Sequence, residues 1–170
     1  MTFYSEEKLP SMGFRYIGKH VCLSDKAIVY NPGAISIGDY SRIDDFCILS
    51  AGKGGIQIGR NVHIACYCSL IGQGIIRVED FCGLSARTTV FSSNDDYSGY
   101  AMTNPTIPDV FKNVQHGDIL FKKHALIGAG SLILPNVTIG TGAVIGAMSL
   151  VKHDCEEFWV YAGTPAVKIK

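Results

Sequence analysis

The sequence has no run of apolar residues near the ~20 that a membrane-spanning helix needs. It has no excess of positive charge either, because Lys and Arg together number 15 and Asp and Glu also number 15. A chain without a clustered basic excess lacks the electrostatic basis for binding nucleic acid. The opening residues, MTFYSEEKLPSMG, are acidic and broken by Pro10, unlike a signal peptide. We therefore expect a cytoplasmic protein with neither a membrane nor a nucleic acid as partner.

Cysteine pairs of the CxxC type are also missing, although the chain contains six cysteines. The two that lie closest are Cys66 and Cys68, which is not the spacing of a zinc ribbon or a redox motif. Free cysteine usually behaves as a small buried apolar residue. We expect that role here, and no metal site.

What the sequence does have is a repeat of six residues. In the second half, a bulky apolar residue recurs at every sixth place: Phe121, Ile127, Ile133, Ile139, Ile145 and Val151. A smaller residue follows each one four places later. The same six-residue period continues through the first half, from Leu23 to Val90. The position of the smaller residue is occupied by a cysteine at Cys47, Cys68, Cys82 and Cys155. A hexapeptide period is typical of a parallel β-helix, whereas an antiparallel sandwich would show a period of two.

The interruptions of the repeat carry further information. Longer steps of eight, nine and eight residues follow Val29, Leu49 and Leu70, each after a set of three hexads. If three hexads make one coil of a triangular prism, every insertion leaves at the same corner. After the next set of three hexads, the spacing between bulky residues is 31, from Val90 to Phe121. Loops longer than ~15 residues in a compact domain are usually functional or disordered.

We therefore predict an all-β fold, a parallel β-helix in a single domain spanning residues 1–170. Its repeats cover about 23–90 and 121–155, one long loop protrudes at about 91–120, and a short C-terminal tail covers 156–170.

The stretch HALIGAGSLILPNVTIGTGAVIGAMSLV, followed by YAGTPAVKIK, resembles the left-handed β-helix (hexapeptide-repeat) acyltransferases. Further motifs, IDDFCILS, NVHIACYCSLIG and DDYSG, resemble the branch that acts on sugars of bacterial surface polysaccharides. The resemblance implies a left-handed prism and a homotrimer with active sites in the clefts between prisms. It also implies acyl transfer, with acetyl as the expected group, from acetyl-CoA or another acyl-CoA to a small-molecule sugar.

Asp95, with Asp96 beside it, occupies the place where many members of this family carry a catalytic histidine, five residues after the position of Val90. A hydroxyl acceptor needs a positioned base, whereas a carboxylate can hold and orient an ammonium group. This substitution favours the amino group of a nucleotide-linked amino-deoxy sugar over a sugar hydroxyl, which stays the alternative. The two acids also suit a plain turn in SNDDYSG. His116, at the far end of the loop, is a third catalytic candidate.

The resemblance also suggests binding residues on the prism. The expected substrate contacts are His63, Tyr67, Arg87 and Asn94, with interface packing as the alternative for Tyr67 and Arg87. The expected coenzyme contacts are Ala129, Ala147, Lys152, Lys168 and Lys170. Small residues would admit the pantetheine arm, and the lysines would meet its phosphates as point charges. We expect His124 and His153 on the surface, His153 near the coenzyme.

Two other functions use a prism of this kind. The γ-type carbonic anhydrases bind zinc through histidines five residues apart plus one on another coil, but the nearest pair here, His116 and His124, is eight apart. A non-catalytic scaffold would leave the long loop and its acids unexplained.

Overall fold

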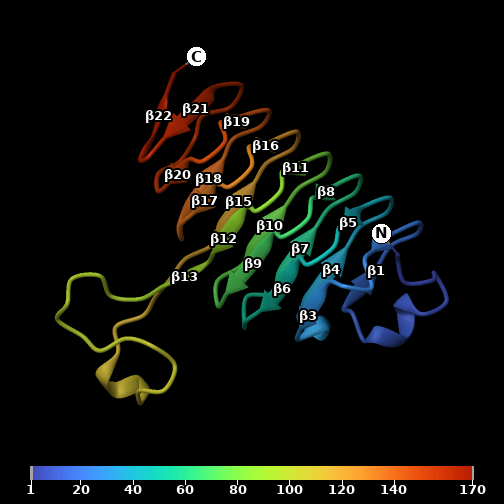
Figure 1. The fold of residues 1–170 in the computed structure, drawn as a ribbon, viewed down its shortest axis with the longest axis horizontal. Coiled ribbons are helices and arrows are strands. Elements are labelled where there is room, and N and C mark those ends of the chain that lie inside the picture. The colour runs from blue at the N-terminus through green and yellow to red at the C-terminus, as the bar shows by residue number, and fades with distance from the viewer. Residues whose placement is uncertain (1, 170) are drawn as a thin grey trace.

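The computed structural model describes residues 2–169, which wind into a prism of three parallel sheets with one long excursion (Figure 1). The first sheet contains β1 (Tyr16–Ile17), β4 (Ile35–Ile37), β7 (Ile56–Ile58), β10 (Ile76–Val78), β15 (Ile119–Phe121) and β18 (Val137–Ile139). The second contains β2 (Cys22–Leu23), β5 (Arg42–Ile43), β8 (His63–Ile64), β11 (Gly83–Leu84), β16 (Leu126–Ile127), β19 (Val144–Ile145), β21 (Val160–Gly163) and β22 (Ala166–Lys168). The third contains β3 (Ile28–Tyr30), β6 (Ile48–Ala51), β9 (Ser69–Gly72), β12 (Thr89–Phe91), β17 (Leu132–Ile133) and β20 (Leu150–Val151). The predicted parallel β-helix is confirmed.

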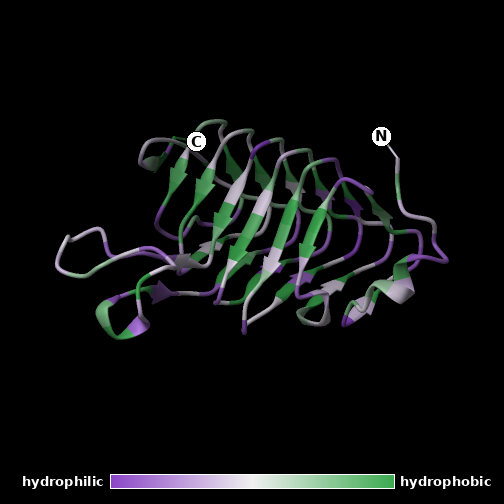
Figure 2. Cartoon of the chain, turned by 60° about the horizontal axis from the view of Figure 1, so that its bottom comes forward, coloured by the Kyte–Doolittle hydropathy of each residue, from purple (hydrophilic) through white to green (hydrophobic). Residues whose placement is uncertain are grey.

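The bulky residues of the repeat stack in columns inside the prism. In the first sheet, Val78 pairs with Ile58 on one side and with Phe121 on the other, and Phe121 then pairs with Ile139. These four side chains are at most 4% exposed. Figure 2 shows the apolar residues concentrated along the strands and the hydrophilic ones mainly in the turns and the N-terminal segment. The bulky residue that recurs at every sixth position is therefore the inward-facing side chain of each strand.

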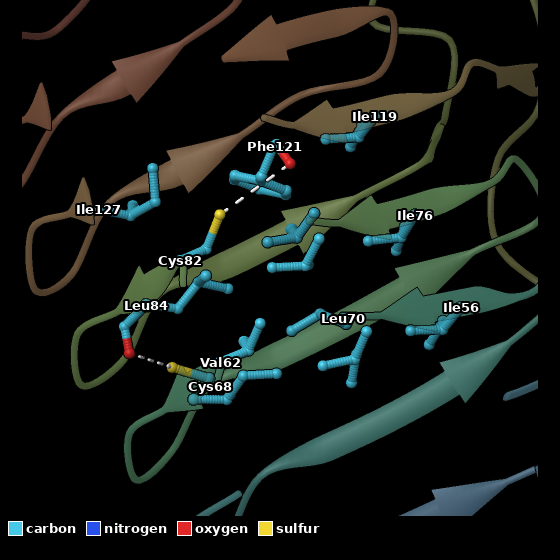
Figure 3. Close-up of a cluster of buried hydrophobic side chains, with 14 of the residues drawn as sticks. Ile56, Val62, Cys68, Leu70, Ile76, Cys82, Leu84, Ile119, Phe121 and Ile127 are labelled. Carbon is cyan, nitrogen blue, oxygen red and sulfur yellow. Dashed lines mark hydrogen bonds between the residues drawn. The ribbon is translucent and has the colours of Figure 1, made fainter. Parts of the chain in front are cut away.

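Four cysteines fill the small interior places, as predicted. Cys47, Cys68, Cys82 and Cys155 are all buried. Each of the first three thiols donates a hydrogen bond to a carbonyl oxygen of the next coil; that of Cys82 lies 3.1 Å from the oxygen of Lys122. Figure 3 shows both thiols among the buried side chains, with the sulfur of Cys68 directed at the carbonyl oxygen of Leu84 and that of Cys82 at the carbonyl oxygen of Phe121. Burial raises the pKa of Cys82 to about 11, so its thiol stays neutral in the folded protein.

All the insertions leave at the corner between the third and first sheets, as predicted. β12 and β15 bracket the longest insertion, and the chain between them forms an antiparallel hairpin of β13 (Ser93–Asn94) and β14 (Gln115–His116). Beyond the hairpin the chain projects away from the prism (Figure 1) and contains the short 3-10 turn η3 (Asp109–Phe111). The fold continues on both sides of the interruption, because β10 and β15 pair in parallel across it.

The prism extends further at both ends than the repeat indicates. It begins with β1 at Tyr16, after an N-terminal segment that contains η1 (Leu9–Met12), while η2 (Pro32–Ala34) fills the first corner insertion. The residues expected as a tail add β21 in parallel to β19, and β22 then turns back antiparallel along β21. Tyr161 of β21 pairs with Ile145 and is buried. An aromatic side chain therefore closes the core at a position that the six-residue period does not predict.

The helical content of residues 2–169 is limited to η1, η2 and η3, each of three or four residues. Within this part of the chain, no helix has the length and apolar character to cross a membrane.

Candidate functional site

The hairpin at the base of the long loop brings the predicted loop residues together. Asn94 pairs with Gln115, and Ser93 pairs with His116 across the two strands. The Oγ of Ser93 also lies 2.8 Å from Nδ1 of His116. His116 is therefore fixed opposite Ser93, on the strand that leads two residues later into Asp95.

The two adjacent acids have different surroundings. Asp96 accepts a hydrogen bond from the backbone N–H of Ser98 at 2.8 Å, and the hydrogen bonds from Ser98 hold the pKa of Asp96 below its usual value. This is the turn-forming role that Asp commonly has in loops. Asp95 is exposed at the end of β13. The turn interpretation therefore fits Asp96, and Asp95 is the acid left to meet a ligand.

An open pocket of about 830 Å³ lies beside the hairpin, between the loop and the corner insertions of the prism. Its polar lining includes Lys53, Gln73, Ser93, Lys112 and His116. The two lysines were missed by the sequence reasoning. Lys53 stands in a corner insertion, the kind of place where repeats carry binding residues, and this was the available signal.

A ladder of exposed side chains follows the corner between the second and third sheets. Phe46 and Tyr67 stack with their ring centroids 5.0 Å apart, and the guanidinium of Arg87 lies 6.0 Å from the Tyr67 ring centroid. All three have a backbone φ of 62°, so each side chain leaves the turn in the same direction. Tyr67 and Arg87 point outward on successive coils, as predicted.

His63 lies on the outer face of β8 and is held by a buried acid. Its Nε2 lies 2.9 Å from a carboxylate oxygen of Asp44, while the other oxygen accepts a hydrogen bond from Nε of Arg42 at 2.6 Å. Asp44 is only 6% exposed. The sequence reasoning missed Asp44, although its place, directly after a bulky residue, holds Ala65, Ser85, Gly128 and Gly146 on later coils. A carboxylate where the repeat otherwise has small residues was the signal.

The predicted coenzyme contacts are spread along the C-terminal coils. Ala129 and Ala147 are exposed on adjacent coils, joined by the hydrogen bond from the backbone N–H of Met148 to the carbonyl of Ala129 at 2.8 Å. Lys152 is exposed. Lys168 is engaged within the chain, because its Nζ lies 2.8 Å from a Glu156 carboxylate oxygen and 3.6 Å from the Trp159 ring centroid. Lys170 lies outside the described residues.

The candidate residues form separate groups on a single chain. The loop group contains Asn94, Asp95, Asp96 and His116, at the corner between the third and first sheets. His63, Tyr67 and Arg87 lie on the second sheet and its corner with the third, so the third sheet separates the two groups. His124 and His153 are exposed, as expected. Within residues 2–169, no three His, Cys, Asp or Glu side chains are grouped in a way that would hold a metal ion.

Comparison with known proteins gives three informative matches. The family described as bacterial transferase hexapeptide (six repeats) matches residues 121–153. The dTDP-4-amino-4,6-dideoxy-D-glucose acyltransferase of Escherichia coli is 47% identical over 169 residues, which is 99% of this chain and 88% of that protein.

Among solved structures, AntD from Bacillus cereus, an N-acyltransferase in complex with dTDP and 3-hydroxybutyryl-CoA, superimposes with a TM-score of 0.95. It is 50% identical, and the match covers 99% of this chain and 88% of that one. A serine-to-alanine variant of AntD in complex with dTDP-4-amino-4,6-dideoxyglucose and coenzyme A has a TM-score of 0.96 at 49% identity, over 99% of this chain and 90% of that one.

Proposed function

This chain belongs to the hexapeptide-repeat acyltransferases, and we propose that it transfers an acyl group from coenzyme A to the amino group of dTDP-4-amino-4,6-dideoxyglucose. The observation that carries this proposal is likeness over the whole length. The E. coli acyltransferase named for this sugar matches 99% of the chain at 47% identity. The likeness thus includes the long loop and its hairpin as well as the repeat, which many acyltransferases share.

The chemistry at the loop agrees with an amine acceptor. The amine nitrogen attacks the thioester carbonyl carbon, the C–N bond forms, the C–S bond breaks, and the thiolate takes up a proton. An ammonium group must lose only one proton to become a strong nucleophile, and a carboxylate can orient it for that loss. Asp95 supplies an exposed carboxylate at the end of β13. His116 stands across the hairpin but already contacts Ser93. We therefore assign Asp95 to the ammonium and treat His116 as a secondary contact.

We assign the acyl-CoA to the corner between the second and third sheets. Ala129 and Ala147 leave the backbone there open to a ligand, and Lys152 is exposed nearby in sequence on the coil of β20. The expected acyl group is acetyl; 3-hydroxybutyryl, the group present in the AntD complex, is the other group to test. We place the enzyme in the cytoplasm.

We further propose that the enzyme works as a homotrimer, with each loop lying over a neighbouring prism. The loop exposes large side chains that a monomer would leave in water: Tyr97 is 86% exposed, Tyr100 96% and Val110 82%. Contiguous exposed apolar surface usually marks an interaction site. A neighbouring copy would also bring the loop group of one chain to the second-sheet group of another, which a single chain keeps apart.

A product analysis tests the proposal. The protein is incubated with dTDP-4-amino-4,6-dideoxyglucose and either acetyl-CoA or 3-hydroxybutyryl-CoA, and free thiol is followed over time. The product is then treated with hydroxylamine, which cleaves esters but leaves amides intact. We expect a product one acyl group heavier that survives hydroxylamine. A hydroxylamine-sensitive product would instead show O-acylation.

A further inference from the structure

His63 and Asp44 form a pair on the outer face of the prism that the loop chemistry leaves unused. Asp44 is buried, yet it faces outward, between Arg42 on its own coil and His63 on the next. A buried carboxylate is costly unless it is paired and hydrogen-bonded. The side chain is therefore retained in a defined position, with one oxygen on each partner.

The contact fixes which nitrogen of His63 is free. An ionised carboxylate can only accept hydrogen bonds, so the Nε2 of His63, 2.9 Å from Asp44, must carry the proton. In the neutral ring Nδ1 is then the unprotonated nitrogen, available as a proton acceptor. This is the arrangement of a general base whose orientation is set by a third group.

The next coil leaves room beside the ring. Gly83 pairs with His63 in the second sheet, and Leu126 follows Gly83 on the coil after that. A Cβ atom built on Gly83 would have only the Leu126 side chain within 4 Å. The result is an open notch of about 210 Å³, lined by residues that include His63, Ala65, Gly83, Ser85 and Leu126. Of the side chains that line it, only those of His63 and Ser85 are polar.

The charged groups around the ring are few. β5 and the residue after it supply Arg42 and Asp44, which are paired to each other. On the other side, β11 and β16 present Gly83 and Leu126, which carry no charge. The ring is therefore the titratable group that the notch offers to a ligand.

We propose that His63 is the proton acceptor for the acceptor amine and that Asp44 is its positioning residue; this rests on the proposed function. Nδ1 of His63 takes one proton from the sugar ammonium, leaving the free amine. The amine nitrogen bonds to the thioester carbonyl carbon and the sulfur leaves as thiolate. One of the two protons now on the nitrogen passes to the thiolate, and the amide keeps the other. His63 then releases its proton to water. Asp95, brought from a neighbouring copy, orients the ammonium by its charge.

Kinetics of substituted proteins test the role of the ring. We expect His63→Ala to lower kcat by about 10²–10⁴-fold, the usual contribution of general acid–base catalysis. Coenzyme A binding should stay unchanged, and thermal stability should fall only modestly, because Asp44 loses one partner but keeps its hydrogen bond from Arg42. Added imidazole should restore part of the activity, because the notch has space for it. Asp44→Asn should lower kcat less, and imidazole should not rescue it. His124→Ala, an exposed histidine that does not line the notch, is the matched control and should match the wild type.

Wild-type kcat in His63→Ala would overturn the proposal, and so would a loss confined to the KM for the sugar. A second measurement needs no substrate. Nitrogen-15 NMR of the histidine rings above neutral pH should find His63 protonated on Nε2 in the wild type, and this preference should disappear in Asp44→Asn. Protonation on Nδ1 in the wild type would refute the claim that Asp44 holds the His63 proton on Nε2. Failure of the proposed function would appear separately, as absence of acyl transfer to the dTDP-amino sugar by the wild type.

Discussion

The Oγ of Ser93 lies 2.8 Å from the Nδ1 of His116, and this contact joins two residues that are 23 positions apart in the sequence. It lies where the long excursion leaves the prism and returns to it. Both residues also pair through the backbone of β13 and β14. The entry to the loop is thus held in a defined geometry, so a substitution at Asp95, directly after β13, can change the charge without displacing the hairpin.

Replacing Asp95 by Asn should remove the charge that orients the ammonium group while keeping the shape of the side chain. A hydrogen bond to a charged group contributes roughly 1.5–3 kcal/mol, and each 1.36 kcal/mol is about tenfold in rate. We expect kcat/KM to fall about ten- to a hundredfold or more, measured by thiol release from acyl-CoA. The melting temperature and coenzyme A binding should be those of the wild type.

Asp96→Asn is the matched control, because Asp96 stands next to Asp95 but accepts the hydrogen bond from the N–H of Ser98. Asn can make the same bond with its side-chain oxygen, so activity should stay within about threefold of the wild type. Full activity in Asp95→Asn together with a large loss in Asp96→Asn would reverse the assignment of the two acids.

His116→Ala should cost less activity than Asp95→Asn. One ring nitrogen of His116 is occupied by Ser93, so the residue mainly supports the hairpin. The comparison is made by measuring kcat/KM of both variants on the same acceptor. A complete loss in His116→Ala, with Asp95→Asn fully active, would show that the essential residue of the loop is the histidine and not Asp95.

The solution mass should be about three times 18.4 kDa. The proposed trimer would cover the exposed aromatic side chains of the loop, Tyr97 and Tyr100, with a second copy of the chain. Light scattering at micromolar concentration measures this directly. A stable monomer that acylates the sugar at full rate would contradict the proposal that the active site is shared between neighbouring copies.

Folding should weaken above pH 9 because of the buried thiols. Burial raises the pKa of Cys82 to about 11 and that of Cys155 to about 11, from an ordinary value of 9.0. The folded state therefore favours the neutral thiol. Its contribution is fully present below the unfolded-state pKa and is lost as pH rises through the folded-state pKa. The loss should reach on the order of 1 kcal/mol per thiol near pH ~10.

Urea unfolding of the wild type and of a Cys82→Ala, Cys155→Ala double variant at both ends of this pH range measures the effect. The double variant lacks these thiols and should lose less stability between the two conditions, although other groups titrate in both proteins. An equal loss in the two proteins would show that the thiols are not protected by the core.

The sequence predicted the prism well because each coil repeats one local rule. The bulky residue of each hexad must face inward, so a column such as Val78, Phe121 and Ile139 can be read from spacing alone, even across the long loop. The end of the prism was harder to predict. Tyr161 closes the core at a position outside the six-residue period. Only the structure, in which it pairs with Ile145 and is buried, identifies it as a core residue.

The site was only partly predictable for the same reason. Asp95 was found because the loop interrupts the repeat, and His63 because it must point outward. Asp44 was missed, since its pairing with His63 depends on two side chains meeting across adjacent coils, 19 residues apart. Spacing gives the register of the coils, but it does not give the rotamers that bring these two groups to hydrogen-bonding distance.

The most direct test of the central claim compares two acceptors that differ in one group. The first is dTDP-4-amino-4,6-dideoxyglucose, and the second is the same nucleotide sugar with a hydroxyl in place of the amine. The account predicts that kcat/KM for the amine exceeds that for the hydroxyl by at least about a hundredfold, and that Asp95→Asn reduces the difference. Equal values for the two acceptors, or preference for the hydroxyl, would contradict it.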